Sequence, residues 1–249
     1  MYRYKCIISY DGYDYMGFQI QNDLKTIELE LMTAIKKMIG IDVKIYPSGR
    51  TDRYVHAINQ VIHFDLEKYL SPKGLKRGIN TYLPDDIYIK SVELVDLDFH
   101  SRFSAIAKEY RYYINRLEYN PLNKRYIANI FYKLDIDKMN EAIKLFIGTH
   151  DFKGFASSQI DERKDTVKTI YEAKMNVYDE KLEFIFIGTG FFKYQERKMM
   201  GALIDIGRGH LDKEVINKIF LTNDSKYSHR VAPGEGLYIY NVYYEDYNG

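Results

Sequence analysis

The sequence predicts an α+β protein made of two ferredoxin-like halves, residues 1–103 and 104–249. Two observations support this fold class. In the first half, the signals run strand, helix, strand, strand, helix, strand, which is the ferredoxin-like order, and the second half repeats a similar series. The chain is also 46% hydrophobic over 249 residues, enough for one large domain or two smaller ones. Two such halves could join their antiparallel sheets side by side and leave a central cleft between them.

The first half contains four segments with the composition of strands, at residues 2–9, 43–46, 55–65 and 87–95. Two helices are expected between them. Thr26 can cap a helix whose apolar residues share one face and which ends at Gly40. Ser71 as a cap and Pro72 in the first turn begin a second helix, which should run to about residue 79.

In the second half, strands are expected at residues 104–115, 167–178, 181–187 and 237–244. The middle two form a hairpin that turns at Asp179-Glu180. Asp137 should cap a helix that ends before Gly148, and His150-Asp151 is expected in the turn that follows. Two more helices are expected at residues 191–206 and 212–220.

The charge is nearly balanced, with 36 basic and 35 acidic residues and a net charge of +1. This total argues mildly against a nucleic-acid partner, but the distribution matters more. Residues 101–126 carry six basic residues against two acidic ones, interleaved with Phe and Tyr. Cations neutralise phosphates and aromatic rings stack on bases, so this segment suits RNA. An ordinary edge strand with solvated Lys and Arg has the same composition.

Several classes of site have no signal in the sequence. The single cysteine, Cys6, lies in an apolar run, so we expect a buried strand residue, no disulfide and a reducing compartment. The six histidines lack metal-ligand spacings, and His56 and His63 are expected to pack or hydrogen-bond on one strand. No metal or cofactor is expected. The N-terminus lacks a signal peptide and no apolar run approaches about 20 residues, so a soluble, cytoplasmic protein is expected.

The stretch Ser48–Ala57 holds the strongest candidate for catalysis. Arg50 and Asp52 follow a glycine, at the rim of the strand predicted for residues 55–65. Loop ends that a rigid sheet positions are where catalytic groups are commonly held. The alternative is a surface Arg–Asp pair that caps a turn, since exposed ion pairs are common and contribute little.

With Ser48–Ala57 followed by Gln60-Val61, the sequence resembles the TruA family of tRNA pseudouridine synthases, whose hallmark is Gly-Arg-Thr-Asp-x-Gly-Val-His-Ala. The likeness covers nearly the whole chain. Further matching segments lie, in the family's order, at residues 10–21, 98–105, 108–112, 148–152, 190–201 and 232–237.

The resemblance implies the pseudouridine synthase fold, with RRM-like halves, and an isomerase that converts uridine to pseudouridine in RNA. It implies the anticodon stem-loop of tRNA as substrate and a homodimer. By motif position, Asp52 is the catalytic aspartate and Arg197 its ion-pair partner. Arg50 enters the space of the flipped nucleotide, which offsets part of the cost of base extrusion. Tyr110 stacks on the uracil, and Leu237 packs on the base's other side.

Two departures from the family pattern affect the expected substrate. Tyr54 stands where the hallmark has Gly, so it either reshapes the loop or narrows the RNA entrance. Glu196 replaces a usually apolar residue beside Arg197 and could compete for that arginine. A relative that modifies another structured RNA, such as ribosomal RNA, is therefore an alternative. Others are a non-catalytic RNA-binding protein of the same fold, and a metabolic enzyme, for which no small-molecule motif is present.

Overall fold

The computed structural model describes residues 1–157, 165–227 and 230–245, and it divides into two compact units. The first comprises Met1–Ile106 with the segment that begins at Tyr238, and the second comprises Ala107–Leu237. Both contain helices and a sheet, so the α+β prediction is confirmed. Residue contacts extend the first unit to Ile106 and group the last strand, from Tyr238, with it. Within the described ranges, no helix combines the length and the apolarity needed to cross a membrane.

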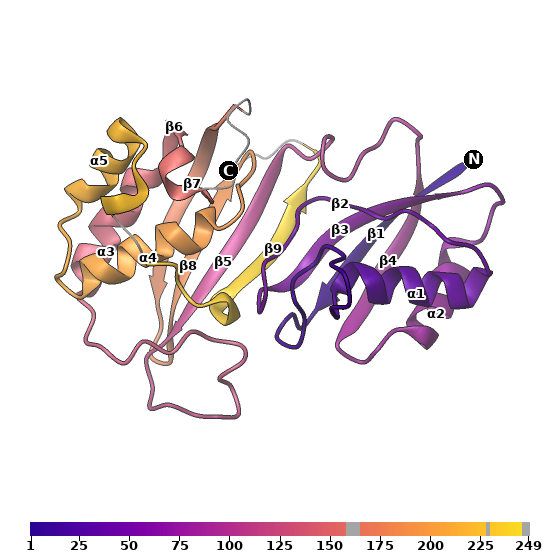
Figure 1. Ribbon diagram of the computed structural model, residues 1–249, viewed down its shortest axis with the longest axis horizontal. Helices are drawn as coiled ribbons and strands as arrows, with labels where there is room; N and C mark the ends of the chain where they lie inside the picture. Colours follow the sequence, from indigo (N-terminus) through magenta and orange to yellow (C-terminus); the bar gives the residue numbers. More distant parts are fainter. Residues whose placement is uncertain (158–164, 228–229, 246–249) are drawn as a thin grey trace. The chain divides into compact units, whose positions relative to one another are not determined.

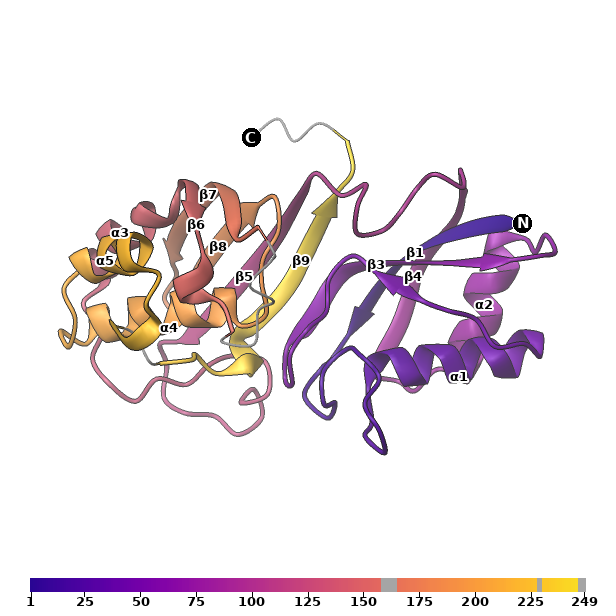
Figure 2. The same ribbon diagram turned by 45° about the horizontal axis from the view of Figure 1, so that its top comes forward.

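The first unit contains a sheet with helices on one face (Figures 1 and 2). Its strands lie in the order β4 (Ile87–Val95), β1 (Tyr2–Tyr10), β3 (His56–Leu66), β9 (Leu237–Tyr243), and the short β2 (Tyr46–Pro47) pairs with β3. Its helices are α1 (Ile27–Ile39) and α2 (Pro72–Tyr82). The strands β4, β1 and β3 pair antiparallel, as expected. In contrast, β9 joins β3 in parallel, through His56–Tyr238 and Ala57–Ile239.

Local sequence signals explain these elements. Alternate residues of β1 (Tyr4, Cys6, Ile8 and Tyr10) are buried, which is the pattern of a strand with one covered face. The Thr26 side chain accepts a hydrogen bond from Leu29 N, and Gly40 ends α1 in the left-handed conformation at φ 79°. These predictions, including the buried Cys6, are confirmed.

Two boundaries in the first unit differ from the sequence-based expectation. The strand expected at residues 43–46 begins only at Tyr46. Val43 and Ile45 are buried but lie outside any strand, so their alternation reflects packing and not strand pairing. Helix α2 continues past residue 79 to Tyr82.

The second unit contains an antiparallel sheet in the order β5 (Ala107–Asn115), β8 (Lys181–Gly188), β7 (Val167–Val177), β6 (Gly148–Asp151). Its helices are α3 (Ile136–Ile143), α4 (Gln195–Gly207) and α5 (Glu214–Thr222) (Figure 1). Short 3₁₀ turns lie at Lys144–Phe146, Lys153–Phe155, Ser225–Tyr227 and Gly234–Gly236. Phe146 packs edge-on against Phe155 and Phe186, which anchors the first two turns to the core.

The predicted hairpin of β7 and β8 is confirmed, whereas three details of the second unit were wrong. Helix α3 is capped by Asp135 rather than Asp137, since the Asp135 carboxylate accepts from Lys138 N at 3.1 Å. His150 and Asp151 lie in strand β6 instead of a helix-ending turn. Helix α4 begins at Gln195, four residues later than expected, because Tyr194 before it has a left-handed backbone with φ 67°.

Candidate active site

The loop that carries Asp52 is fixed to β3 by a buried amide. Ser48 N donates to Val61 O at 2.8 Å, and the Ser48 hydroxyl bonds Gln60 Oε1 at 2.5 Å. Gln60 is fully buried, and its Nε2 donates to Gly49 O at 2.7 Å. A buried amide must satisfy both its donors and its acceptor, so these bonds hold the start of the loop in one arrangement.

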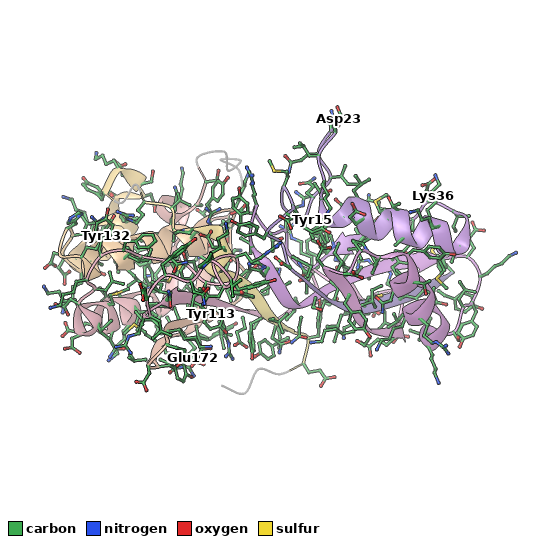
Figure 3. The ribbon with its side chains drawn as sticks, turned by 90° about the horizontal axis from the view of Figure 1, so that it is seen from below. Tyr15, Asp23, Lys36, Tyr113, Tyr132 and Glu172 are labelled. Atoms are coloured by element: carbon green, nitrogen blue, oxygen red, sulfur yellow. The ribbon has the colours of Figure 1, made fainter. Side chains whose placement is uncertain are left out.

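The segment between β1 and α1 supports the same loop from another side. Phe18 N donates to Thr51 O at 3.0 Å, and the hydroxyls of Thr51 and Tyr10 hydrogen-bond at 3.0 Å. The backbone of this segment lies so close to the loop at Val55 that only glycine fits at residue 12, since a Cβ there would lie 1.9 Å from Val55 O. Figure 3 shows this segment projecting to Asp23 at its tip, with Tyr15 nearer its base.

Asp52 opens a tight turn at the end of the loop. Val55 N donates to Asp52 O at 3.2 Å, and Tyr54, the third residue of the turn, has φ 69°. Turns with a positive φ at this position favour glycine. Asp52 is half-buried, while Arg50 and Arg53 are exposed. The loop therefore presents one carboxylate flanked in sequence by two exposed arginines on a fixed backbone.

His56 and His63 have the packing roles expected of them. The His56 ring is buried, accepts from Gly12 N at its Nδ1 at 3.1 Å, and stacks on Tyr238 with centroids 4.7 Å apart. The His63 ring stacks on Tyr46 at 4.8 Å, and its Nδ1 accepts from Ser101 N at 3.1 Å. His56 thereby ties β3, directly after the Asp52 turn, to the segment that supports the loop.

The second unit places Tyr110 and Leu237 in apolar surroundings. Tyr110 on β5 is 6% exposed, and its ring meets Phe191 edge-on at 4.9 Å. Leu237, the first residue of β9, is 3% exposed. The chain before Leu237 is fixed by the Tyr112 hydroxyl, which donates to Pro233 O at 2.9 Å. Burial raises the pKa of Tyr112 well above its usual value, so this hydroxyl remains a donor.

Arg197 on α4 is bound to the chain near residue 232. Its Nε donates to Ala232 O at 2.8 Å, and Ala232 N donates to Arg197 O at 2.9 Å. The guanidinium also lies 5.4 Å from the centroid of the Tyr194 ring. Arg197 is half-buried, and its neighbour Glu196 is buried. One bond holds the guanidinium through its Nε, and the other joins the two backbones.

The five residues singled out from the sequence fall into two groups. Asp52 and Arg50 belong to the first unit, whereas Tyr110, Arg197 and Leu237 belong to the second. Sequence reasoning missed Tyr13, whose ring lies 5.1 Å from that of Tyr54. No spacing in the sequence points to this pair, because it depends on the contact between Gly12 and Val55. Among the described residues, no group of three or more His, Cys, Asp or Glu side chains is arranged to hold a metal ion.

The basic segment 101–126 is only partly available to a ligand. Lys108 is buried, and Arg111 forms ion pairs with Glu109 at 2.7 Å and Glu183 at 2.9 Å. Arg102 and Lys124 are exposed. Part of the basic and aromatic composition therefore builds the sheet of the second unit, and the rest lies on its flanking loops.

Comparison with known proteins agrees with this arrangement of motifs. A family model described as "tRNA pseudouridine synthase" matches residues 6–104 and 142–245. The chain is 42% identical to "tRNA pseudouridine synthase A" of Geobacillus sp., over 98% of this chain and 99% of the relative. It is 40% identical to the protein of the same name from Exiguobacterium sp., over 98% and 99%. "tRNA pseudouridine synthase A 1" of Bacillus cereus is 39% identical, over 99% and 100%.

Among solved structures, "Crystal Structure of a Cbf5-Nop10-Gar1 Complex" is similar at a TM-score of 0.34 and 12% identity, over 80% of this chain and 54% of that chain. A likeness this slight supports no conclusion about function.

Proposed function

The chain belongs to the tRNA pseudouridine synthase family, and on that basis we propose that it isomerises uridine to pseudouridine in the anticodon stem-loop of tRNA. The observation that carries the proposal is the 42% identity to a tRNA pseudouridine synthase A over nearly the full length of both chains. The reaction detaches uracil from its ribose at N1, rotates it, and rejoins it through C5. Because it rearranges a single molecule, it consumes no co-substrate.

We assign Asp52 as the catalytic residue. An ionised carboxylate can promote the isomerisation by adding covalently to the nucleotide or by removing a ribose proton, and both routes need the charged form next to the bound base. The fixed backbone supports this assignment, since hydrogen bonds from Gln60, Phe18 and Tyr10 hold the residues around Asp52 in place. A catalytic group held in one geometry loses less entropy when the substrate binds.

The remaining assignments concern binding of the flipped nucleotide. Arg197 is assigned as the cation that keeps Asp52 ionised, an effect that opposes desolvation. The exposed Arg50 is assigned to the space that the extruded base leaves, which offsets part of the unstacking cost. Tyr110 and Leu237 are assigned to opposite faces of the uracil. The buried Tyr110 ring, held edge-on by Phe191, supports a flat stacking surface.

Release of tritium from [5-³H]uridine in a tRNA transcript tests Asp52, because C5 loses its hydrogen when it bonds to the ribose. Asp52→Asn and Asp52→Ala should lower the rate by at least about 100-fold. Both should still bind the transcript in a filter or gel-shift assay. Asp42→Asn is the matched control, since Asp42 is an exposed carboxylate that pairs with Lys36 and should keep the wild-type rate. Release at the wild-type rate by Asp52→Asn would show that the assignment is wrong.

The substrate is tested with the same assay on other RNAs. Wild-type protein should release tritium from tRNA transcripts and not from those whose anticodon stem-loop uridines are replaced by cytidine. Activity on ribosomal RNA fragments alone would instead favour another structured RNA as the target. We expect the enzyme to act in the cytoplasm and to form a homodimer. The molar mass of the purified protein, measured by light scattering, tests the dimer.

A further inference from the structure

Tyr54 is a tyrosine in a position whose backbone favours glycine. It is the third residue of the turn that Val55 N closes onto Asp52 O, and its φ is 69°. A bulky residue with a left-handed backbone is strained, because Cβ crowds the neighbouring carbonyl. Glycine would remove this strain at once. Strained residues of this kind are concentrated where they bind or catalyse, so the tyrosine side chain itself needs an explanation.

The Tyr54 ring lies close to a second ring and to a cation. Its centroid lies 5.1 Å from that of Tyr13, with an angle of 39° between the planes. On the same ring, the Arg53 guanidinium lies 4.4 Å from the centroid. Both tyrosines are half-buried and Arg53 is exposed, so the group is at the surface of the first unit. Two neighbouring aromatic rings and one guanidinium bring together the groups that bind single-stranded bases, since rings stack on bases and cations attract phosphates.

The backbone beneath this surface is fixed. A Cβ on Gly12 would lie 1.9 Å from Val55 O, so the residues before Tyr13 and after Tyr54 are in direct contact. Gly12 N donates to the buried His56 ring at 3.1 Å, and Tyr13 N donates to Asp11 Oδ1 at 3.0 Å. The Tyr13–Tyr54 pair is therefore held before any ligand arrives, and little side-chain entropy is lost on binding.

We infer that Tyr54, supported by Tyr13 and Arg53, stacks on the base next to the target uridine. The inference rests on the proposed function, because it takes Asp52 as the residue that meets the target. Two residues of chain span at most about 7 Å, and successive nucleotides of a strand rise about 3.4 Å. A ring two residues from the catalytic carboxylate therefore reaches a neighbouring base. When the target is extruded, its neighbour loses a stacking partner, and Tyr54 replaces that partner.

Two substitutions at residue 54 separate stacking from a purely structural role. Tyr54→Gly should raise KM for tRNA on the order of 5- to 150-fold, as expected for the loss of one stacked base. Its melting temperature should stay close to that of the wild type, because relief of the strained φ opposes the loss of the contact with Tyr13. Tyr54→Phe keeps the flat ring and should retain the wild-type KM. The control is Tyr88→Ala, an exposed β4 tyrosine that also has a lysine, Lys76, over its ring at 5.7 Å.

Abasic substrates test the stacking directly. In transcripts with an abasic nucleotide on one side of the target uridine, wild-type KM should rise while the KM of Tyr54→Gly stays unchanged. The Tyr54→Gly variant on the abasic transcript should then show no higher KM than either change alone produces. If Tyr54→Gly keeps the wild-type KM, or if abasic substitution on either side weakens both proteins equally, the inference is overturned. If the wild type forms no pseudouridine in intact tRNA, the proposed function fails instead.

Discussion

At the scale of single residues, His63 is held in its neutral form by its neighbours. Its Nδ1 accepts from Ser101 N at 3.1 Å, and the Ser101 hydroxyl donates to Tyr46 O at 2.6 Å. The bond from Ser101 N requires an unprotonated Nδ1. Burial, reinforced by the Arg3 guanidinium, lowers the pKa of His63 to about 4. His63 therefore takes up a proton near pH 6.5 in the unfolded chain but only near pH 4 in the folded one.

This difference predicts a loss of stability in mild acid. The unfolded chain binds more protons than the folded one between about pH 6.5 and 4, so the free energy of unfolding falls as the pH drops through that window. The free energy of unfolding is not reduced by His63 above pH 6.5. Below that pH, the reduction attributable to His63 is at most about 3 kcal/mol. Urea unfolding at pH 7.5 and 4.5 measures it.

His63→Gln is the variant to compare, since glutamine does not titrate and the pH dependence of its unfolding should be flatter. His100→Gln is needed beside it, because burial also lowers the pKa of His100 and that histidine can also lower the stability in acid. An equally steep dependence in His63→Gln would show that other groups cause the acid sensitivity.

Much of the candidate site could be predicted at this scale, and the reasons for the gaps are physical. The sequence predicts Asp52 and Arg50 as site residues because the hallmark is contiguous and Gln60 follows at a fixed distance in sequence. The role of Gln60 in holding Gly49 could not be predicted, because it requires the strand to return past the loop. Tyr13 and Tyr54 are 41 positions apart and meet only through the Gly12–Val55 contact, so no local pattern pairs them.

At the scale of elements, the site depends on glycine where segments cross. Gly12 has no room for a side chain, whereas Gly40 ends α1 with φ 79° and has open space around its Cβ position. Gly190 also has open space, and its φ is not in the left-handed region. A side chain is therefore excluded by contact at Gly12, by the backbone conformation at Gly40, and by neither at Gly190.

Alanine at these three positions should have graded effects. Gly12→Ala must displace the Val55 carbonyl, so both the melting temperature and the rate of pseudouridine formation should fall. Gly40→Ala should cost roughly 1 kcal/mol of stability from the left-handed backbone while activity stays at the wild-type level. Gly190→Ala should leave the stability unchanged. Thermal unfolding and the tritium assay check all three, and an active, fully stable Gly12→Ala would contradict the proposed crossing.

The elements that the sequence predicts well are those whose ends have a local cause. Thr26 and Gly40 bound α1, and the turn at Asp179-Glu180 separates β7 from β8. The errors arise where two local signals compete or where packing decides. Asp135 and Asp137 are both good caps, and only the path of the chain selects Asp135. Val43 and Ile45 alternate as in a strand, but burial alone accounts for that pattern.

At the scale of the whole molecule, the net charge of +1 limits non-specific attraction to RNA. The basic segment 101–126 contributes less than its composition suggests, because Lys108 is buried and Arg111 is paired with two glutamates. Lys124 is exposed on the loop after β5, and Tyr119 and Tyr126 of the same loop are also exposed. Affinity for RNA should therefore depend on a few local contacts.

Salt dependence tests whether Lys124 is one of these contacts. When binding neutralises a phosphate, counterions are released, and log affinity falls with log salt concentration by about 0.7 to 0.9 per contact. In the Asp52→Asn background, which should bind tRNA without converting it, Lys124→Gln should reduce this slope by about that amount. Lys37→Gln on the exposed face of α1 should leave the slope unchanged. Equal slopes for the two variants would place the RNA away from this loop. The net charge of the protein is only +1, so the loss of one cation is a large relative change. The difference in slope should therefore be measurable between 50 and 200 mM salt, where phosphate contacts lose much of their contribution to affinity.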